Sequence, residues 1–158
     1  MKLSKVTAAA TIVAAVMTIM LLSACAGSEL LLKNSDTGTV WAEYSVDEGD
    51  TFAVTFVHSV NKSPVTETYE IKDGSIYLTS CIYYGFGAGV ATEMEDGWVL
   101  SYDNTGEMII SGIDKRIDCL NYIVGTVSDH ILEIDGQSVS LRDLCGQNSK
   151  VSFQVQRK

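Results

Sequence analysis

Two histidines and the polar residues beside them are the first candidates for chemistry in this sequence. Ser59 follows His58 and Asp129 precedes His130, so the side-chain types of a serine nucleophile, a base and an acid are present. The chain has no Gly-x-Ser-x-Gly turn, and neighbouring residues on a strand point to opposite faces, which makes the pattern a weak indication of hydrolysis. A hydrolase therefore stays an alternative, and we favour a role without catalytic residues.

The same histidines could also bind a metal ion. His58 and His130 would need a carboxylate such as Glu67 or Glu93, and only the fold could bring these residues together, because the local His-x-x-x-His pattern is absent. Histidines at strand ends more commonly hydrogen-bond loop backbone. The sequence leaves the metal open, and we expect no organic cofactor or redox centre, since no Cys-x-x-Cys spacing occurs.

A glycine-rich stretch and one arginine suggest that an anion is bound. Residues 85–89 could form a nest of backbone amides for a carboxylate, and they lack the Gly-Lys-Ser or Gly-Lys-Thr of a nucleotide phosphate loop. Arg116 is a candidate carboxylate clamp. Its alternative role is a surface ion pair with Asp114 or Asp118.

The candidate ligand-binding residues share polar side chains or free backbone amides near predicted strand ends. They are His58, Ser59, Glu67, Phe86, Gly87, Ala88, Gly89, Glu93, Arg116 and His130. In this hypothesis the glycine-rich amides and Arg116 receive the charged group of a small organic anion, while the histidines and Glu67 bind its polar substituents or a cation.

Short alternating segments are the elements that must position these residues. Residues 51–57 alternate apolar and polar side chains, and the only proline, Pro64, starts the return strand of a hairpin that runs to residue 71. Further strands are predicted over residues 40–46, 75–84, 98–102, 107–113, 117–127, 131–134 and 151–155. Roughly nine short strands predict an all-β fold, a single-domain antiparallel β-sandwich or partly open barrel.

One helical turn is the exception to the strand pattern. We expect it over residues 140–145, with Ser140 as its N-terminal cap and Gly146 as its end.

The first residues of the chain predict export. Lys2 and Lys5 precede an uncharged apolar run over residues 6–22, which ends in the sequence Leu-Ser-Ala-Cys at Cys25. This ending resembles the lipobox of bacterial lipoproteins, in which the cysteine is lipidated and becomes the mature N-terminus. The alternative is an uncleaved membrane anchor. We expect a signal peptide over residues 1–24, a lipidated N-terminus and tether over residues 25–38, and one all-β domain over residues 39–158.

The charge balance excludes one class of partner. The chain carries a net charge of −9, and removal of residues 1–24 takes away two lysines and no acid, which gives 9 − 20 = −11. An acidic protein of this kind does not bind nucleic acid or anionic lipid through its surface. A solvated acidic face explains the net charge better than a role in collecting cations.

The cysteines leave one question open. Cys81, Cys119 and Cys145 cannot all pair with one another, so a disulfide between two of them stays open.

Several of these motifs, taken in order, resemble one bacterial family. They are His58-Ser59-Val60 with Pro64-Val65 and Glu67, Tyr84 to Gly89 with Thr92-Glu93, His130 ahead of Leu132, and the segment over residues 136–155. Together they resemble domain of unknown function 1850, and the resemblance extends over about residues 40–155.

The resemblance implies a context and no activity. Members of that family are commonly encoded beside, or fused to, the membrane subunit of TAXI-type TRAP transporters, which import small organic acids and amino acids. It implies an extracytoplasmic accessory of such a transporter, and together with the ending at Cys25 it predicts a lipid-anchored accessory or binding module at the extracytoplasmic face of a bacterial membrane. Its expected partners are the membrane, through Cys25, the TRAP membrane and solute-binding subunits, and a small organic anion. A histidine- or metal-dependent hydrolase and a purely structural interaction protein remain the alternatives.

Overall fold

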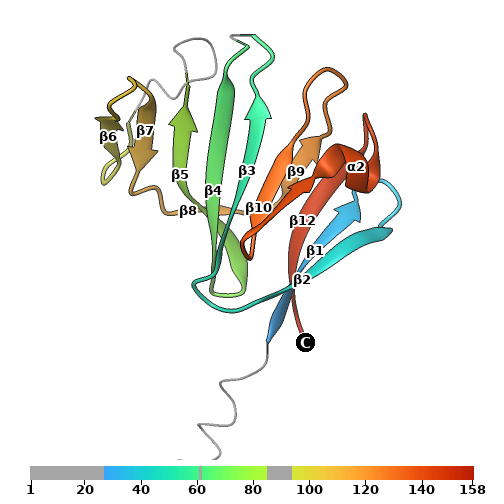
Figure 1. Ribbon diagram of the computed structural model, residues 1–158. Coiled ribbons are helices and arrows are strands. Elements are labelled where there is room, and N and C mark those ends of the chain that lie inside the picture. The colour runs from blue at the N-terminus through green and yellow to red at the C-terminus, as the bar shows by residue number, and fades with distance from the viewer. Residues whose placement is uncertain (1–26, 61, 85–93) are drawn as a thin grey trace, which may run out of the picture.

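Two antiparallel β-sheets packed against each other form the protein (Figure 1). The computed structural model describes residues 27–60, 62–84 and 94–158. The smaller sheet has the strand order β2-β1-β12-β9, and the larger has the order β11-β10-β3-β4-β5-β7-β6, with β8 also paired to β5. The prediction of an all-β sandwich is confirmed, and the described strands do not close into a barrel.

The described elements are twelve strands and one short helix. Their bounds are β1 Ser28–Asn34, β2 Val40–Val46, β3 Thr51–Val57, β4 Pro64–Lys72, β5 Ser75–Tyr83, β6 Val99–Tyr102, β7 Met108–Ser111, β8 Lys115–Ile117, β9 Leu120–Ile123, β10 Ile131–Ile134, β11 Gln137–Ser140, α2 Leu141–Cys145 and β12 Lys150–Arg157.

Local sequence signals place several elements correctly. Strands β2, β3 and β10 have the predicted bounds, and β4 begins at the proline that starts the predicted return strand. The helical turn α2 also lies where expected, because the Ser140 side chain accepts a hydrogen bond from Asp143 N and Gly146 ends the turn with a positive φ of 86°.

The predicted tether is wrong over its central part, because residues 28–34 form strand β1. This strand lies between β2 and β12 in the smaller sheet. Leu30 and Leu32 are 0% exposed and belong to the core, while Leu31 is 4% exposed on the opposite face. Three consecutive leucines lack the period-two alternation of a half-buried strand, since both faces of this strand are covered.

The strand predicted over residues 117–127 is two shorter strands in different sheets. β8 pairs with β5 in the larger sheet, and β9 pairs with β12 in the smaller one. The chain therefore crosses from one sheet to the other at Asp118 and Cys119, which closes one side of the sandwich. A continuous apolar pattern cannot reveal such a crossing, because both strands still send alternate side chains to the same core.

Stacked aromatic rings and aliphatic side chains fill the space between the sheets. The Phe52 ring lies 5.1 Å from that of Tyr69 on β4 and 5.7 Å from that of Phe153 in the other sheet. A smaller cluster around Cys81 and Ile110 continues under β5 and β7, where the larger sheet is wider than the smaller one. The core is thus continuous beneath both sheets and thins toward the edge strand β6.

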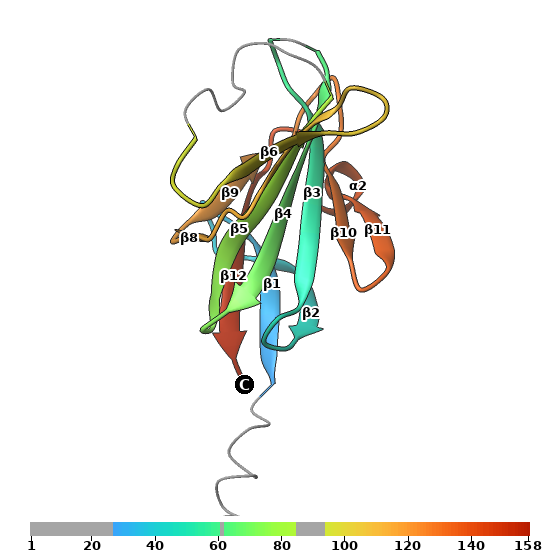
Figure 2. The ribbon, with the colours of Figure 1, turned by 90° about the vertical axis from the view of Figure 1, so that its left-hand side faces the viewer.

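The ends of the sandwich differ in what they carry. The C-terminus and the start of β1 lie at one end, and the β3–β4 and β9–β10 connections lie at the other (Figures 1 and 2). These two connections hold both histidines of the chain. A ligand at the histidine end would therefore bind far from the start of the described chain.

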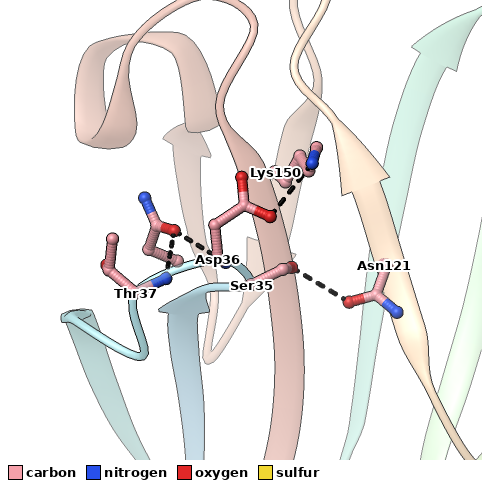
Figure 3. Close-up of polar contacts among 6 residues, drawn as sticks. Ser35, Asp36, Thr37, Asn121 and Lys150 are labelled. Carbon is pink, nitrogen blue, oxygen red and sulfur yellow. Dashed lines mark hydrogen bonds and ion pairs between the residues drawn. The ribbon is translucent and has the colours of Figure 1, made fainter.

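Polar contacts fix the smaller sheet near its histidine end (Figure 3). The Lys150 ammonium lies 3.0 Å from Asp36 Oδ1, and Ser35 Oγ donates to Asn121 Oδ1 over 3.2 Å. Asn34 Oδ1 accepts the backbone N–H groups of Asp36 and Thr37. The β1–β2 turn thus holds both β12 and β9, the strand that leads into the β9–β10 connection.

The burial of β1 predicts a large stability effect. Replacing Leu32 with alanine should lower the free energy of unfolding by about 2–5 kcal/mol, because a fully buried leucine leaves a cavity behind. Chemical unfolding of the full chain measures this. The matched control is Leu100→Ala on β6, where the leucine is 42% exposed and the loss should stay near 0.5 kcal/mol, about the size of ordinary surface effects. Equal losses in the two variants would contradict the placement of β1 in the core.

Candidate functional site

Strand periodicity sends a ladder of polar and aromatic side chains toward the histidine end. Alternate residues of one strand share a face, so Phe52, Val54 and Phe56 on β3 point into the core, and His58 continues their row beyond the strand. On β4 the inward row is Val65, Glu67, Tyr69 and Ile71. A carboxylate therefore lies on the core face of a central strand.

The Glu67 carboxylate is held by two tyrosines from different sheets. Tyr69 on β4 donates its hydroxyl to Glu67 Oε2 over 2.9 Å, and Tyr122 on β9 donates to the same oxygen over 2.5 Å. The two hydroxyl oxygens lie 2.7 Å apart. Tyr122 was not among the predicted site residues, although its alternation with Leu120 and Val124 places it on the inward face of β9.

This cluster changes the acidity of the groups around it. Burial raises the pKa of Tyr122, and the neighbouring Tyr69 and Glu67 raise it further. Burial and Glu67 raise the pKa of Tyr69 in the same way. Cys81 lies opposite Glu67 on β5, and burial followed by the charge of Glu67 raises the pKa of its thiol to about 11. The phenols and this thiol are thus protonated at neutral pH.

His130 forms the next layer above the tyrosines. Its ring stacks on Phe56 with centroids 5.4 Å apart and lies 5.5 Å from the ring of Tyr122. The backbone N–H of Gly125 donates to His130 Nδ1 over 3.4 Å. Burial lowers the pKa of His130, the charge of Arg142 lowers it further, and Asp129 offsets part of the change. The imidazole is therefore neutral at pH 7.

The Asp129 carboxylate accepts hydrogen bonds from the backbone around His130, and none of its described hydrogen bonds involves the imidazole ring. Its carboxylate accepts the N–H groups of His130 at 2.7 Å and Arg142 at 3.0 Å, and the hydroxyl of Ser140 at 2.5 Å. These bonds join the start of β10 to the start of α2. Among the described contacts nothing connects Ser59, His130 and Asp129 as a nucleophile, base and acid would be connected.

His58 is fixed by a tight turn after β3. Its N–H donates to Ser63 O over 2.9 Å, and Lys62 N donates to His58 O over 3.0 Å. The Val60 N–H donates to His58 Nδ1 over 3.3 Å. Lys62 has a positive φ of 57°, which fixes the direction in which its side chain leaves the turn.

Both histidines therefore have the same tautomer. A backbone N–H can only donate, so Nδ1 of His58 and of His130 must be an acceptor. In the neutral ring the proton then resides on Nε2. Each imidazole offers an Nε2–H donor, and neither Nε2 has a partner among the described residues.

The two histidines line one cavity of about 320 Å³. Its walls come from the β3–β4 and β9–β10 connections, and they include Ser59, Lys62, Gly125, Thr126 and Ser128. The aliphatic side chains of Val57, Ile123 and Val127 complete the lining. No aspartate or glutamate lines it among the described residues, whereas each of three other cavities in this part of the chain has at least one.

Arg116 is not part of this site. It lies on β8 opposite Tyr77, which is six residues, or about 20 Å at the rise of a strand, from the end of β5 that neighbours Pro64. Its Nε lies 3.1 Å from Asp118 Oδ1 in an exposed ion pair. The alternative of a surface ion pair is confirmed, and the structure does not bring this arginine to the histidines.

The remaining predicted site residues do not line the cavity in the described part of the chain. Phe86, Gly87, Ala88, Gly89 and Glu93 lie outside the described residues, and so does Cys25. Glu67 lies below the cavity and reaches it through Tyr122, whose ring contacts His130. Lys62 was not predicted, although its place in the same turn as His58 and Ser59 could have indicated it.

Metal and thiol chemistry find little support in the described part of the chain. There, no group of three or more His, Cys, Asp or Glu side chains is arranged to hold a metal ion. Cys81, Cys119 and Cys145 are all free thiols, so the disulfide that the sequence left open does not form among them. In residues 27–60, 62–84 and 94–158 no helix is long and apolar enough to cross a membrane.

The fold defines an all-β sandwich domain with a histidine-lined cavity at one end. The chain belongs to the family described as domain of unknown function (DUF1850), whose model matches residues 52–141. This range spans both connections that build the cavity. The chain has no significant match among curated proteins or among solved structures.

The tyrosine cluster predicts how stability depends on alkaline pH. Folding raises the pKa of Tyr122, so its contribution is complete below the ordinary phenol value of about 10 and is lost as the pH rises above it, because only the unfolded state releases the proton. In Tyr122→Phe the free energy of unfolding should fall less steeply above about pH 10. At pH 7 this variant should lose about 1–3 kcal/mol of unfolding free energy, because the partly buried carboxylate of Glu67 loses a hydrogen-bond donor.

Chemical unfolding of the full chain at neutral and alkaline pH measures both effects. Tyr84→Phe is the control, since this tyrosine is exposed and lies outside the cluster. An identical pH dependence in Tyr122→Phe and the unchanged protein would contradict the proposed role of the phenol.

Proposed function

We propose that this protein is a binding module that holds a small organic anion in the cavity between the β3–β4 and β9–β10 connections. The observation that carries the proposal is that Nδ1 of His58 and Nδ1 of His130 each accept a backbone N–H group, which leaves Nε2 of each ring as the donor. His58, His130 and Lys62 belong to one cavity lining, and none of the described residues of that lining is a carboxylate. A carboxylate accepts several such hydrogen bonds at once.

Charge supports an anion at this place. The chain has a net charge of −9, so most of its surface repels anions. Among the described residues the lining of this cavity has one lysine and no acid, whereas three other cavities each have at least one acid. An anionic ligand would therefore be attracted to this end of the sandwich and repelled elsewhere.

The same tautomer argues against a metal ion between the histidines. A metal binds the lone pair of an imidazole nitrogen, and the other nitrogen then carries the proton and donates it. Here Nδ1 of each ring already accepts a backbone N–H, so binding a metal through Nε2 would remove the only ring proton. The metal alternative would require both loops to change their hydrogen bonds.

The wider role follows from the leader sequence and the family. The apolar run that ends at Cys25 supports export and lipidation, which would anchor the domain to the extracytoplasmic face of a bacterial membrane. The family resemblance supports a place beside a TAXI-type TRAP transporter. In this proposal the module binds an organic anion next to the transporter and assists its uptake.

Removing the donors of the cavity should weaken anion binding. We expect Lys62→Ala and His58→Leu each to weaken carboxylate binding by about tenfold or more, because a hydrogen bond to a charged group contributes about 1.5–3 kcal/mol. His58→Gln should retain part of the affinity, since its amide can donate near the position of Nε2. Titration calorimetry of the full chain in a neutral detergent with acetate, hexanoate and adipate measures this.

The matched control is Lys115→Ala, a lysine at the start of β8 that does not line the cavity. It should leave the affinity unchanged. Failure of all the carboxylates to bind, or equal losses in Lys62→Ala and Lys115→Ala, would overturn the anion site.

Membrane attachment and the transporter context are tested together. The full-length protein purified from its own membranes should carry transporter membrane and solute-binding subunits, identified by mass spectrometry. The mature protein should begin at a lipidated Cys25, and Cys25→Ser should carry no lipid and retain residues 1–24, which mass spectrometry of the N-terminus measures. An unmodified Cys25 in the unchanged protein, or the absence of transporter subunits from it, would contradict this part of the proposal.

A further inference from the structure

We infer that the ligand of the histidine cavity is a monocarboxylate with a short aliphatic body. The inference rests on the proposed anion site and narrows its ligand class. Three properties of the cavity carry it: an aliphatic wall beside the polar donors, a single cationic side chain in the lining, and a small volume.

The aliphatic wall is open to solvent in the free protein. Val57, Ile123 and Val127 are 36%, 64% and 95% exposed, and all three line the cavity. Exposed aliphatic side chains gathered around a cavity with polar donors are typical of a binding site for a ligand that is partly apolar. A ligand body placed against them would remove apolar surface from water on both sides.

The polar side of the cavity suits one anionic group. Lys62 is the single cationic side chain in the described lining, and the two imidazoles add neutral Nε2–H donors. The groups that face His130 are Asp129, Arg142, Tyr122 and the ring of Phe56, and none of them adds an accessible cation to the lining. A second carboxylate would have to lie against the aliphatic wall, where it would lose water without gaining a partner.

The net charge of the whole chain also favours a ligand with a single negative charge. A polyanion experiences the repulsion of the net charge of −9 more strongly than a monoanion does. With one lysine available, each further negative charge on the ligand increases this repulsion and gains no ion pair. Di- and tricarboxylates should therefore bind more weakly than a monocarboxylate of the same length.

Volume limits the length of the aliphatic body. The cavity of about 320 Å³ lies at the lower end of the range for small-molecule sites and is open to solvent. A body of about four to six carbon atoms can lie wholly against the aliphatic wall, whereas the far part of a long acyl chain would extend into water and gain no contact.

A matched set of four probes tests the inference. Hexanoate has the carboxylate and the body, adipate adds a second carboxylate to the same chain, hexanamide removes the charge, and acetate removes the body. Calorimetric titration of the full chain in a neutral detergent at pH 7 should give the highest affinity for hexanoate. We expect adipate and acetate to bind about tenfold more weakly or worse, and hexanamide to give no measurable binding.

Variants of the aliphatic wall give a second readout. Val127→Ser and Ile123→Ser should weaken hexanoate binding several-fold and leave acetate binding unchanged, because acetate does not reach the wall. Both side chains are largely exposed, so the fold should tolerate the changes. Val99→Ser on the exposed edge strand β6 is the control and should change neither affinity.

The outcomes separate this inference from the anion site itself. Equal or tighter binding of adipate would overturn the monocarboxylate class while the anion site stands, and equal affinities for acetate and hexanoate would overturn the aliphatic body. Hexanamide binding as tightly as hexanoate, or no binding by any carboxylate, would overturn the anion site as well.

Discussion

The carboxylate of Glu67, held on the core face of β4 by hydroxyls from both sheets, is the interaction on which the arrangement of the site depends. Tyr69 approaches from the same strand, and Tyr122 approaches from the opposite sheet. Glu67 is only partly buried, and a hydrogen bond to a charged group contributes about 1.5–3 kcal/mol. The Tyr122 contact therefore favours the arrangement in which β9 faces β4. A shift of β4 by one residue would turn Glu67 outward and bury Thr66 and Thr68 in its place.

Tyr122 contacts a residue that lines the cavity. Its ring contacts His130, and the His130 ring stacks on Phe56, so the same layer that satisfies Glu67 also orients the imidazole. The Asp129 carboxylate then fixes the backbone of His130 and the start of α2. This order of contacts leaves Nδ1 of His130 facing the Gly125 N–H and leaves Nε2 as a donor. The proposed anion site would thus depend on the packing beneath it as well as on the residues that line it.

The distribution of charge separates two surfaces of the same protein. The chain has 20 acidic and 11 basic side chains, and none of the described residues that line the cavity at the histidine end is acidic. A net negative charge of this kind favours solubility. Arg116, in contrast, is exposed and already paired with Asp118. Its exposed ion pair contributes little, so neither stability nor the proposed ligand requires it.

The sequence by itself determined the fold class and much of the local structure. Alternation placed β3 and β10, Pro64 placed the start of β4, and Ser140 with Gly146 placed α2, because these signals act between residues close in the chain. Tertiary structure decided the rest. It made β1 a central strand because both of its faces are covered, and it separated Arg116 from the histidines because β8 pairs with the part of β5 that is remote from the β3–β4 connection. It also joined the partly buried carboxylate of Glu67 to Tyr122, a donor 55 positions away in the chain.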